Sequence, residues 1–279
     1  MTKNPSSDAT LPKGIHRSWK LPDKSLGDLW DSIVMDEAIK KQLLSQAIVN
    51  FTVRPKVERT VLPLHGVILL VGPPGTGKTS LARGLAHRVA ESFSSAKFRL
   101  LEVEPHTLTS SAMGKTQRAV ADLFSQSIAE SAAAGPTIVL LDEVETLAAD
   151  RAKLSLEANP VDVHRATDAV LVQLDMLAER NPHLLFVATS NFPQAVDSAF
   201  LSRCDMVMEV PLPGKDACKQ ILVDCLNGLA KTFPGIGKLS SAHQFDACAG
   251  ECVGLDGRAI RKVVANALGM VGVSAPERM

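Results

Sequence analysis

Apolar and polar positions along the chain follow two different spacings. Short apolar runs have the length of buried strands and are bounded by polar or turn-forming residues: Val67–Val71, Phe98–Val103, Ile138–Leu141, Leu184–Ala188 and Val207–Val210. Between most of these runs, over residues 79–93, 116–134 and 164–177, apolar residues recur at the spacing of amphipathic helices. The alternation predicts an α/β fold with a five-stranded, largely parallel sheet and helices on both of its faces.

The segment ahead of the first strand has a different character. Residues 1–25 contain three prolines and five Lys or Arg residues with little hydrophobic periodicity, which predicts a flexible basic arm. From Asp36 onward, apolar residues recur at helical spacing as far as Phe51. One more amphipathic helix is therefore expected before the sheet begins.

The carboxyl-terminal part of the chain lacks strand signals. The turn-forming segment 211–214 (Pro-Leu-Pro-Gly) ends the last strand, and helical spacing follows over residues 216–231 and 259–271. We expect two domains: a large α/β domain over residues 26–212 and a small helical lid domain over residues 213–279.

Composition narrows the class of protein. The 279 residues are 46% hydrophobic and 22% charged, which is ordinary for a globular protein. The formal net charge of zero, the aromatic content of 4% and the absence of Tyr argue against direct nucleic-acid binding. No apolar stretch has the length of a membrane span, and the first residues lack the apolar segment of a secretory signal. We therefore expect a cytoplasmic protein without a membrane partner.

The strongest chemical signal follows the first apolar run. Residues 72–79 read Gly-Pro-Pro-Gly-Thr-Gly-Lys-Thr, a full match to the phosphate-binding loop pattern between a strand and a helix. The glycines allow backbone N–H groups to surround phosphate oxygens, and the start of the helix adds partial positive charge. The pattern predicts that Lys78 reaches the β- and γ-phosphates of a nucleotide and that the Thr79 hydroxyl is a ligand of Mg²⁺.

Polar residues also follow two later strands. Asp142 and Glu143 close the strand 138–141, and Asn191 follows the strand 184–188. We expect Asp142 to orient the Mg²⁺ shell, Glu143 to act as general base on a water molecule, and Asn191 to hold that water or the γ-phosphate. The alternatives are a helix cap for the acidic pair and a turn-forming role for Asn191.

Four features follow one another in a characteristic order: the phosphate loop, the Asp-Glu strand end, the Ser-Asn strand end and the helical lid. In this order they resemble an AAA+ ATPase module with a P-loop fold over roughly residues 26–275. Several stretches are further similar to the pachytene-checkpoint ATPases, which remodel HORMA-domain proteins: residues 28–34 (DLWDSIV), 72–81 (GPPGTGKTSL), 141–147 (LDEVETL), 169–175 (AVLVQLD) and 254–258 (GLDGR).

The resemblance implies an ATPase that uses ATP and Mg²⁺ and works as a homohexamer. Arg203 stands where an arginine finger would reach the nucleotide of a neighbouring subunit, and Arg258 matches the sensor arginine of the lid. An ion pair with Asp205 is the alternative for Arg203, and a solvated residue at a helix start is the alternative for Arg258. The implied nucleotide-binding residues are Ile33, Val34, Gly72, Pro73, Pro74, Gly75, Thr76, Gly77, Lys78, Thr79, Ser80 and Asp142, with Thr79 and Asp142 at the metal. Ile33 and Val34 correspond to a loop that packs on adenine, and a plain core contact is the alternative for them.

The first pore loop of such ATPases matches Ala112, Met113 and Gly114. The family has a bulky aromatic residue there, whereas Met113 is flexible and apolar, which suggests a gentler grip on a peptide. The short segment ahead of the match resembles bacterial relatives found with HORMA proteins and nucleotidyltransferases in CBASS anti-phage defence. The implied partner is therefore a HORMA-domain protein, alone or with a nucleotidyltransferase.

Three other functions stay open at this point. They are a generic AAA+ unfoldase with another substrate, a nucleic-acid-associated AAA+ motor, and a scaffold in which ATP binding merely assembles a ring. The neutral charge argues against the motor. The presence of Glu143 and Arg203 argues against the scaffold.

Overall fold

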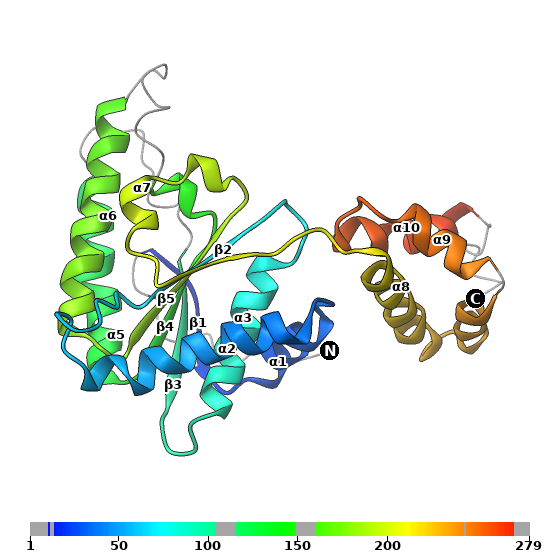
Figure 1. The fold of residues 1–279 in the computed structure, drawn as a ribbon, viewed down its shortest axis with the longest axis horizontal. Helices are drawn as coiled ribbons and strands as arrows, with labels where there is room; N and C mark the ends of the chain where they lie inside the picture. Colours follow the sequence, from blue (N-terminus) through cyan, green and yellow to red (C-terminus); the bar gives the residue numbers. More distant parts are fainter. Residues whose placement is uncertain (1–10, 12–13, 104–114, 149–159, 243, 271–279) are drawn as a thin grey trace.

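The computed structural model describes residues 11, 14–103, 115–148, 160–242 and 244–270. A single sheet with helices on both faces is followed by a group of helices that lies to one side of it (Figure 1). We call residues 15–210 the sheet domain and residues 215–270 the lid. In the part of the chain that is described, no helix is both long and apolar enough to cross a membrane.

The sheet has six strands in the order β1-β3-β4-β5-β2-β6. Its strands are β1 (Ile15–Leu21), β2 (Val67–Val71), β3 (Phe98–Val103), β4 (Thr137–Leu141), β5 (Leu184–Ser190) and β6 (Met206–Glu209). All neighbouring strands are parallel except β1 and β3. The five predicted strands correspond to β2–β6, and β1 is a sixth strand that corrects the expectation of a five-stranded sheet. The strands β4, β5 and β2 end side by side at the carboxyl edge.

The edge strand β1 corrects the expectation of a flexible arm over residues 1–25 as far as residues 15–25 are concerned, whereas residues 1–10, 12 and 13 lie outside the described residues. It pairs antiparallel with β3, and α1 (Lys24–Ser32) follows it directly. The pairing register shifts between Ile15 and Arg17. Because such a shift reverses the faces to which side chains point, Ile15 packs on one face of the sheet while Trp19 and Leu21 pack on the other. This change of face conceals the strand in the sequence.

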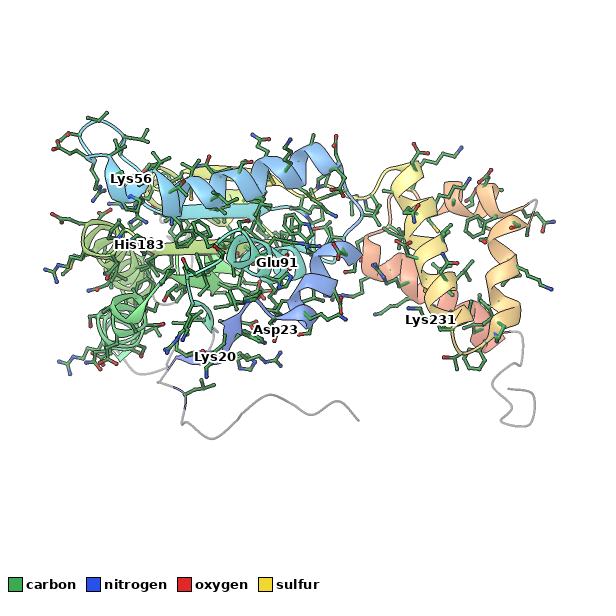
Figure 2. The ribbon with its side chains drawn as sticks, turned by 90° about the horizontal axis from the view of Figure 1, so that it is seen from below. Lys20, Asp23, Lys56, Glu91, His183 and Lys231 are labelled. Atoms are coloured by element: carbon green, nitrogen blue, oxygen red, sulfur yellow. The ribbon has the colours of Figure 1, made fainter. Side chains whose placement is uncertain are left out.

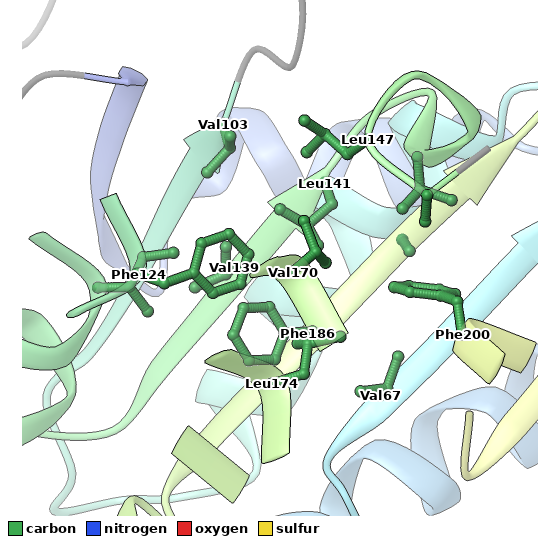
Figure 3. Packing of buried hydrophobic residues seen from close by; sticks show 14 of the residues in the cluster. Val67, Val103, Phe124, Val139, Leu141, Leu147, Val170, Leu174, Phe186 and Phe200 are labelled. Atoms are coloured by element: carbon green, nitrogen blue, oxygen red, sulfur yellow. The ribbon is translucent and has the colours of Figure 1, made fainter. Parts of the chain in front are cut away.

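Two apolar clusters separate along the alternation of the central strands. In β2, for example, Val67 and Leu69 face one cluster, whereas Ile68 and Leu70 face the other. The first cluster includes stacked rings of Phe124 and Phe186, whose centroids lie 5.8 Å apart (Figure 3). Both faces are buried, so the carboxyl edge is where polar side chains of the strand ends meet.

Helices cover both faces. One face carries α4 (Lys115–Asp122), the π-helical segment η3 (Leu123–Ile128), α5 (Ala129–Ala134), α6 (Pro160–Arg180) and α7 (Ser198–Leu201). The other carries α1, α2 (Glu37–Thr52) and α3 (Lys78–Glu91). Short 3-10 turns are η1 (Arg54–Lys56), η4 (Val144–Thr146) and η6 (Pro193–Ala195).

The lid has a core of its own. It consists of α8 (Lys215–Ala230), the 3-10 segment η7 (Pro234–Ser241), α9 (Phe245–Glu251) and α10 (Gly257–Met270). Cys218, Ile221 and Ile260 are among its buried residues. Figure 2 shows this group from below, with Lys231 on the lid and His183 and Glu91 on the sheet domain. The helices that were predicted after residue 214 correspond to α8 and α10.

Asp205 joins the start of β2 to the start of β6. Its carboxylate accepts hydrogen bonds from the backbone N–H groups of His65 (2.8 Å), Gly66 (2.7 Å) and Val67 (3.2 Å). We expect Asp205→Ala to lower the free energy of unfolding by about 2–3 kcal/mol, because three amides lose a charged acceptor. Urea denaturation followed by fluorescence of the two Trp residues measures the loss. Asp122→Ala, at an exposed position of α4, is the control, and an equal effect of both substitutions would contradict the prediction.

Candidate functional site

A cavity of about 650 Å³ lies at the carboxyl edge of the sheet, between the sheet domain and the lid. It is lined by four groups of residues: Ser32–Asp36 and Ile39; Pro74–Ser80; Asp142, Glu143, Thr189 and Asn191; and Val210–Gly214, Ala217, Ile221, Gly257, Arg258 and Arg261. Apart from Gly72 and Pro73, which do not line the cavity, the sequence-predicted residues of the phosphate loop and of the two other strand ends therefore meet in one place. The volume lies in the usual range for small-molecule sites.

Two glycines in the middle and at the end of the loop between β2 and α3 occupy positions that only glycine fits. Gly75 and Gly77 have φ angles of 79° and 94°, in the left-handed region that side chains with a Cβ atom disfavour. A Cβ atom at Gly75 would also lie 2.2 Å from Asp256 Oδ1 of the lid, and one at Gly77 would lie 2.5 Å from Ile33 Cδ1. The glycines thus permit both the turn and the close approach of its neighbours.

Lys78 is the first residue of α3 and is only 5% exposed. Its Nζ atom donates hydrogen bonds to the carbonyl oxygens of Gly72 and Pro73, both at 2.8 Å. Burial lowers the pKa of Lys78, while the nearby carboxylates of Glu145, Asp142 and Glu143 act in the opposite direction. The ammonium group is thus held inside the loop, where phosphate oxygens can replace its carbonyl partners.

Asp142 joins all three strand ends. Its Oδ1 atom accepts hydrogen bonds from the Thr79 hydroxyl (2.8 Å) and from the Thr189 hydroxyl (2.5 Å). The Thr189 oxygen in turn accepts from the backbone N–H of Glu143 at 3.0 Å. Thr189, which is 1% exposed, is therefore a functional residue that the sequence interpretation missed, because a threonine in an apolar run is typical of any buried strand.

Glu143 and Asn191 also lie in contact. The Asn191 amide donates a hydrogen bond from Nδ2 to Glu143 Oε1 at 3.1 Å. Among the described residues, Glu143 is the one non-glycine residue with a positive φ angle, 53°. Strained backbone of this kind is concentrated at functional sites. The turn presents the carboxylate to the cavity, as a general base would require.

The opposite wall of the cavity connects the sheet domain to the lid. Ile33 packs against the apolar cluster of α2 and α3, whereas its neighbour Val34 packs against the core of the lid. Both residues line the cavity, so they can contact the base of a nucleotide. Because Val34 also packs against the lid, a movement of the lid would change this contact. Arg261 Nη2 additionally donates to the carbonyl oxygen of Ser32 at 3.1 Å.

The start of α10 lies over the phosphate loop. Asp256 Oδ1 accepts from the backbone N–H groups of Arg258 (2.8 Å) and Ala259 (2.9 Å), which caps the helix. The side chain of Arg258 is exposed and lines the cavity from the lid. A movement of the lid would therefore move Arg258 relative to the loop.

Arg203 lies away from this cavity, after α7. Its Nε and Nη2 atoms donate to the two carboxylate oxygens of Asp175 in α6, at 2.8 and 2.7 Å, and Nη1 donates to the Ala199 carbonyl oxygen at 2.8 Å. The guanidinium group lowers the pKa of the Asp175 carboxyl. An ion pair with Asp205 was the alternative role of Arg203 in the sequence analysis. The Asp205 carboxylate instead accepts hydrogen bonds from the three backbone N–H groups described above.

The predicted pore-loop residues are not described, and Glu145 contacts the site although no role was predicted for it from the sequence. Ala112, Met113 and Gly114 lie outside the described residues. Glu145 was given no role, yet its Oε1 atom accepts from the Asn191 backbone N–H at 3.1 Å.

The donor groups around the cavity fit a nucleotide with Mg²⁺. The glycine turn, the Lys78 ammonium group and the start of α3 supply positive character for phosphates, and the cavity extends to the apolar side chains of Ile33 and Val34. Thr79 and Asp142 supply adjacent oxygen atoms, which Mg²⁺ prefers. These two residues would hold the ion together with phosphate oxygens.

Comparisons with known proteins agree with this geometry. Residues 68–212 match the family model "ATPase family associated with various cellular activities (AAA)". The pachytene checkpoint protein 2 homolog of Oryza sativa subsp. indica is 35% identical over 234 residues, which cover 82% of this chain and 49% of that protein. The chain thus spans about half the length of the curated relatives it matches first.

Solved structures show the same fold. The structure of C. elegans PCH-2 has a TM-score of 0.74 and 28% sequence identity, covering 94% of this chain and 70% of that one. A chain of the E. coli MS115-1 HORMA:CdnC:Trip13 complex has a TM-score of 0.68 at 19% identity, covering 83% and 82%. At this identity, the second likeness concerns the fold alone.

Proposed function

The chain belongs to the AAA family of ATPases, and from this premise we propose that it uses ATP hydrolysis to remodel a HORMA-domain protein. The observation that carries the ATPase part is the meeting of Lys78, Glu143 and Asn191 around one cavity. The substrate part is supported by the similarity to pachytene checkpoint proteins and by the fold of a chain in a complex that contains HORMA and Trip13.

Each residue of the site has a proposed task. Lys78 binds the β- and γ-phosphates, and Thr79 and Asp142 hold the metal ion. Mg²⁺, when bound, neutralises negative charge on the phosphate oxygens. Glu143 takes the proton of the attacking water, and Asn191 orients Glu143 and that water. Ile33 and Val34 contact the base.

We propose that neighbouring subunits complete the site in a homohexameric ring. Arg203 does not line the cavity of its own subunit, as expected of a finger that serves a neighbour. A guanidinium group suits that task because it is always charged and contacts several phosphate oxygens at once. Arg258 then couples the nucleotide to the lid, and the lid moves Ala112, Met113 and Gly114, which grip the partner in the pore.

The partner that we propose is a HORMA-domain protein bound to a nucleotidyltransferase. The complex named above, in which a chain of the same fold occurs with HORMA and CdnC, supports this choice. Disassembly of such a complex would switch off CBASS-type anti-phage signalling in the cytoplasm.

The test uses the purified chain with a HORMA-domain protein and nucleotidyltransferase from the same genome, preassembled as a complex. ATP hydrolysis per subunit should rise with protein concentration and rise again with the complex, and gel filtration should show the nucleotidyltransferase released only when ATP is hydrolysed. Lys78→Ala, which removes the phosphate-binding ammonium group, should release none.

Other outcomes separate the alternatives. If casein, an unstructured protein, stimulates hydrolysis as strongly as the complex, the chain is a generic unfoldase. If DNA stimulates it instead, the chain is a nucleic-acid motor. If ATP assembles a ring without turnover, the chain is a scaffold, and the proposal is wrong.

A further inference from the structure

Glu145 lies directly behind the wall of the cavity, in the one-turn helix η4 that follows Glu143. Its neighbours in this turn, Val144 and Leu147, are fully buried in the sheet core. The Thr146 backbone N–H and hydroxyl both donate to the Glu143 carbonyl oxygen, at 3.0 and 2.9 Å. The backbone of the turn is therefore held on both sides of Glu145.

The two oxygen atoms of the Glu145 carboxylate lie in different environments. Its Oε1 atom accepts a hydrogen bond from the Asn191 backbone N–H at 3.1 Å. Its Oε2 atom is buried and accepts no hydrogen bond from the residues that the structure describes. A buried carboxylate oxygen without a hydrogen bond is costly for stability, and such atoms in native proteins call for a functional explanation.

The position of Asn191 depends on consecutive contacts at the end of β5. The Thr189 hydroxyl binds Asp142, and the Ser190 carbonyl oxygen accepts from the Gly72 backbone N–H at 3.2 Å. Asn191 itself is held through its backbone by Glu145 and reaches Glu143 through its side chain. Removal of the Glu145 contact would leave the Asn191 backbone anchored only through its neighbours in β5, while the side chain still reaches Glu143.

We propose that Glu145 is a positioning residue of the ATPase site, which fixes the Asn191 backbone so that the Asn191 side chain holds the Glu143 carboxylate. The inference rests on the proposed roles of Glu143 and Asn191. Glu145 does not line the cavity and so does not touch the substrate directly. Burial lowers the pKa of Lys78, and the negative charge of Glu145 opposes this shift more than the charges of Asp142 and Glu143 do.

One isosteric change and one shortening of the side chain separate the hydrogen bond from the charge. Glu145→Gln removes the charge but keeps an oxygen that can accept from Asn191. Glu145→Asp keeps the charge but withdraws it by one methylene from the Asn191 amide. We expect Glu145→Asp and Glu145→Ala to lower kcat by about 10- to 100-fold, because a misplacement of up to an ångström in a catalytic group has a cost of this size. Glu145→Gln should keep most of the wild-type kcat.

The expected signature is a loss in kcat with little change in ATP affinity, measured with a fluorescent ATP analogue. Glu130→Ala, which removes an exposed carboxylate of α5, is the matched control and should leave both values unchanged. Thermal unfolding of every variant reports whether it is folded. If Glu145→Ala does not fold, the Gln and Asp variants alone decide the question.

A double substitution tests whether Glu145 acts through Asn191. In an Asn191→Ala background, Glu145→Ala should cause little further loss, because residues that act as a unit are not additive. The inference is overturned if the two losses multiply, or if Glu145→Gln is as slow as Glu145→Ala, which would assign the role to charge alone. Wild-type protein without ATP turnover would instead contradict the proposed function.

Discussion

Arg203→Ala is expected to lower the kcat of the assembled protein by about 10³- to 10⁵-fold, the contribution that arginine fingers make in related phosphoryl-transfer enzymes. ATP affinity should change little, because Arg203 does not line the cavity of its own subunit. Steady-state hydrolysis against protein concentration measures the effect. The residual rate should no longer depend on concentration.

The ion pair with Asp175 supplies the control. Both side chains are partly exposed, at 23% for Arg203 and 40% for Asp175, and pairs of this kind contribute about 1 kcal/mol or less to stability. Arg203 can therefore exchange Asp175 for phosphate oxygens at small cost. Asp175→Asn weakens the pair and leaves the guanidinium group present, so it should not reproduce the loss.

Mixing experiments test action between subunits. Lys78→Ala subunits lack the phosphate-binding lysine but keep Arg203, whereas Arg203→Ala subunits have the reverse defect. Mixed rings should regain part of the hydrolysis that each variant lacks alone. If mixing restores nothing, or if Asp175→Asn is as slow as Arg203→Ala, the loss reflects local structure and the trans role of Arg203 is wrong.

The central fold was readable from the sequence because its strands are buried on both faces. A run such as Val67–Val71 is apolar throughout, and the phosphate loop that follows it marks the strand end. The strand Ile15–Leu21 was not readable, because it pairs at an edge and its register shift moves apolar residues from one face to the other. In this segment, burial depends on β3, which lies far away in sequence.

The site was predictable where single residues carry the chemistry and unpredictable where contacts position them. Lys78, Asp142, Glu143 and Asn191 follow strand ends, and parallel order brings these ends together. Thr189, Glu145 and Asp175 contact partners that are distant in the chain: 46 residues separate Glu143 from Thr189, and 28 separate Arg203 from Asp175. No local pattern encodes such pairs.

Glu143→Gln is expected to reduce kcat by about 10²- to 10⁴-fold while ATP stays bound. The substitution keeps the size of the side chain and an oxygen that can accept the Asn191 amide, so the shape of the site should persist. It removes the carboxylate to which we assign the removal of a proton from water. Single-turnover hydrolysis measures the chemical step, and a fluorescent ATP analogue measures binding.

The matched control is the same change at Glu145, two positions further along the turn. Glu145→Gln removes one negative charge from the same surroundings, but the positioning role leaves it much of its activity. If kcat falls much further in Glu143→Gln than in Glu145→Gln, the loss comes from the proton acceptor at Glu143 and not from the general negative charge around Lys78. Equal loss in both variants would assign the effect to that charge, and near-normal turnover by Glu143→Gln would remove the base from this position. Retained ATP binding without turnover would also make Glu143→Gln the variant that holds a partner protein on the proposed ring, so that the bound protein can be identified directly.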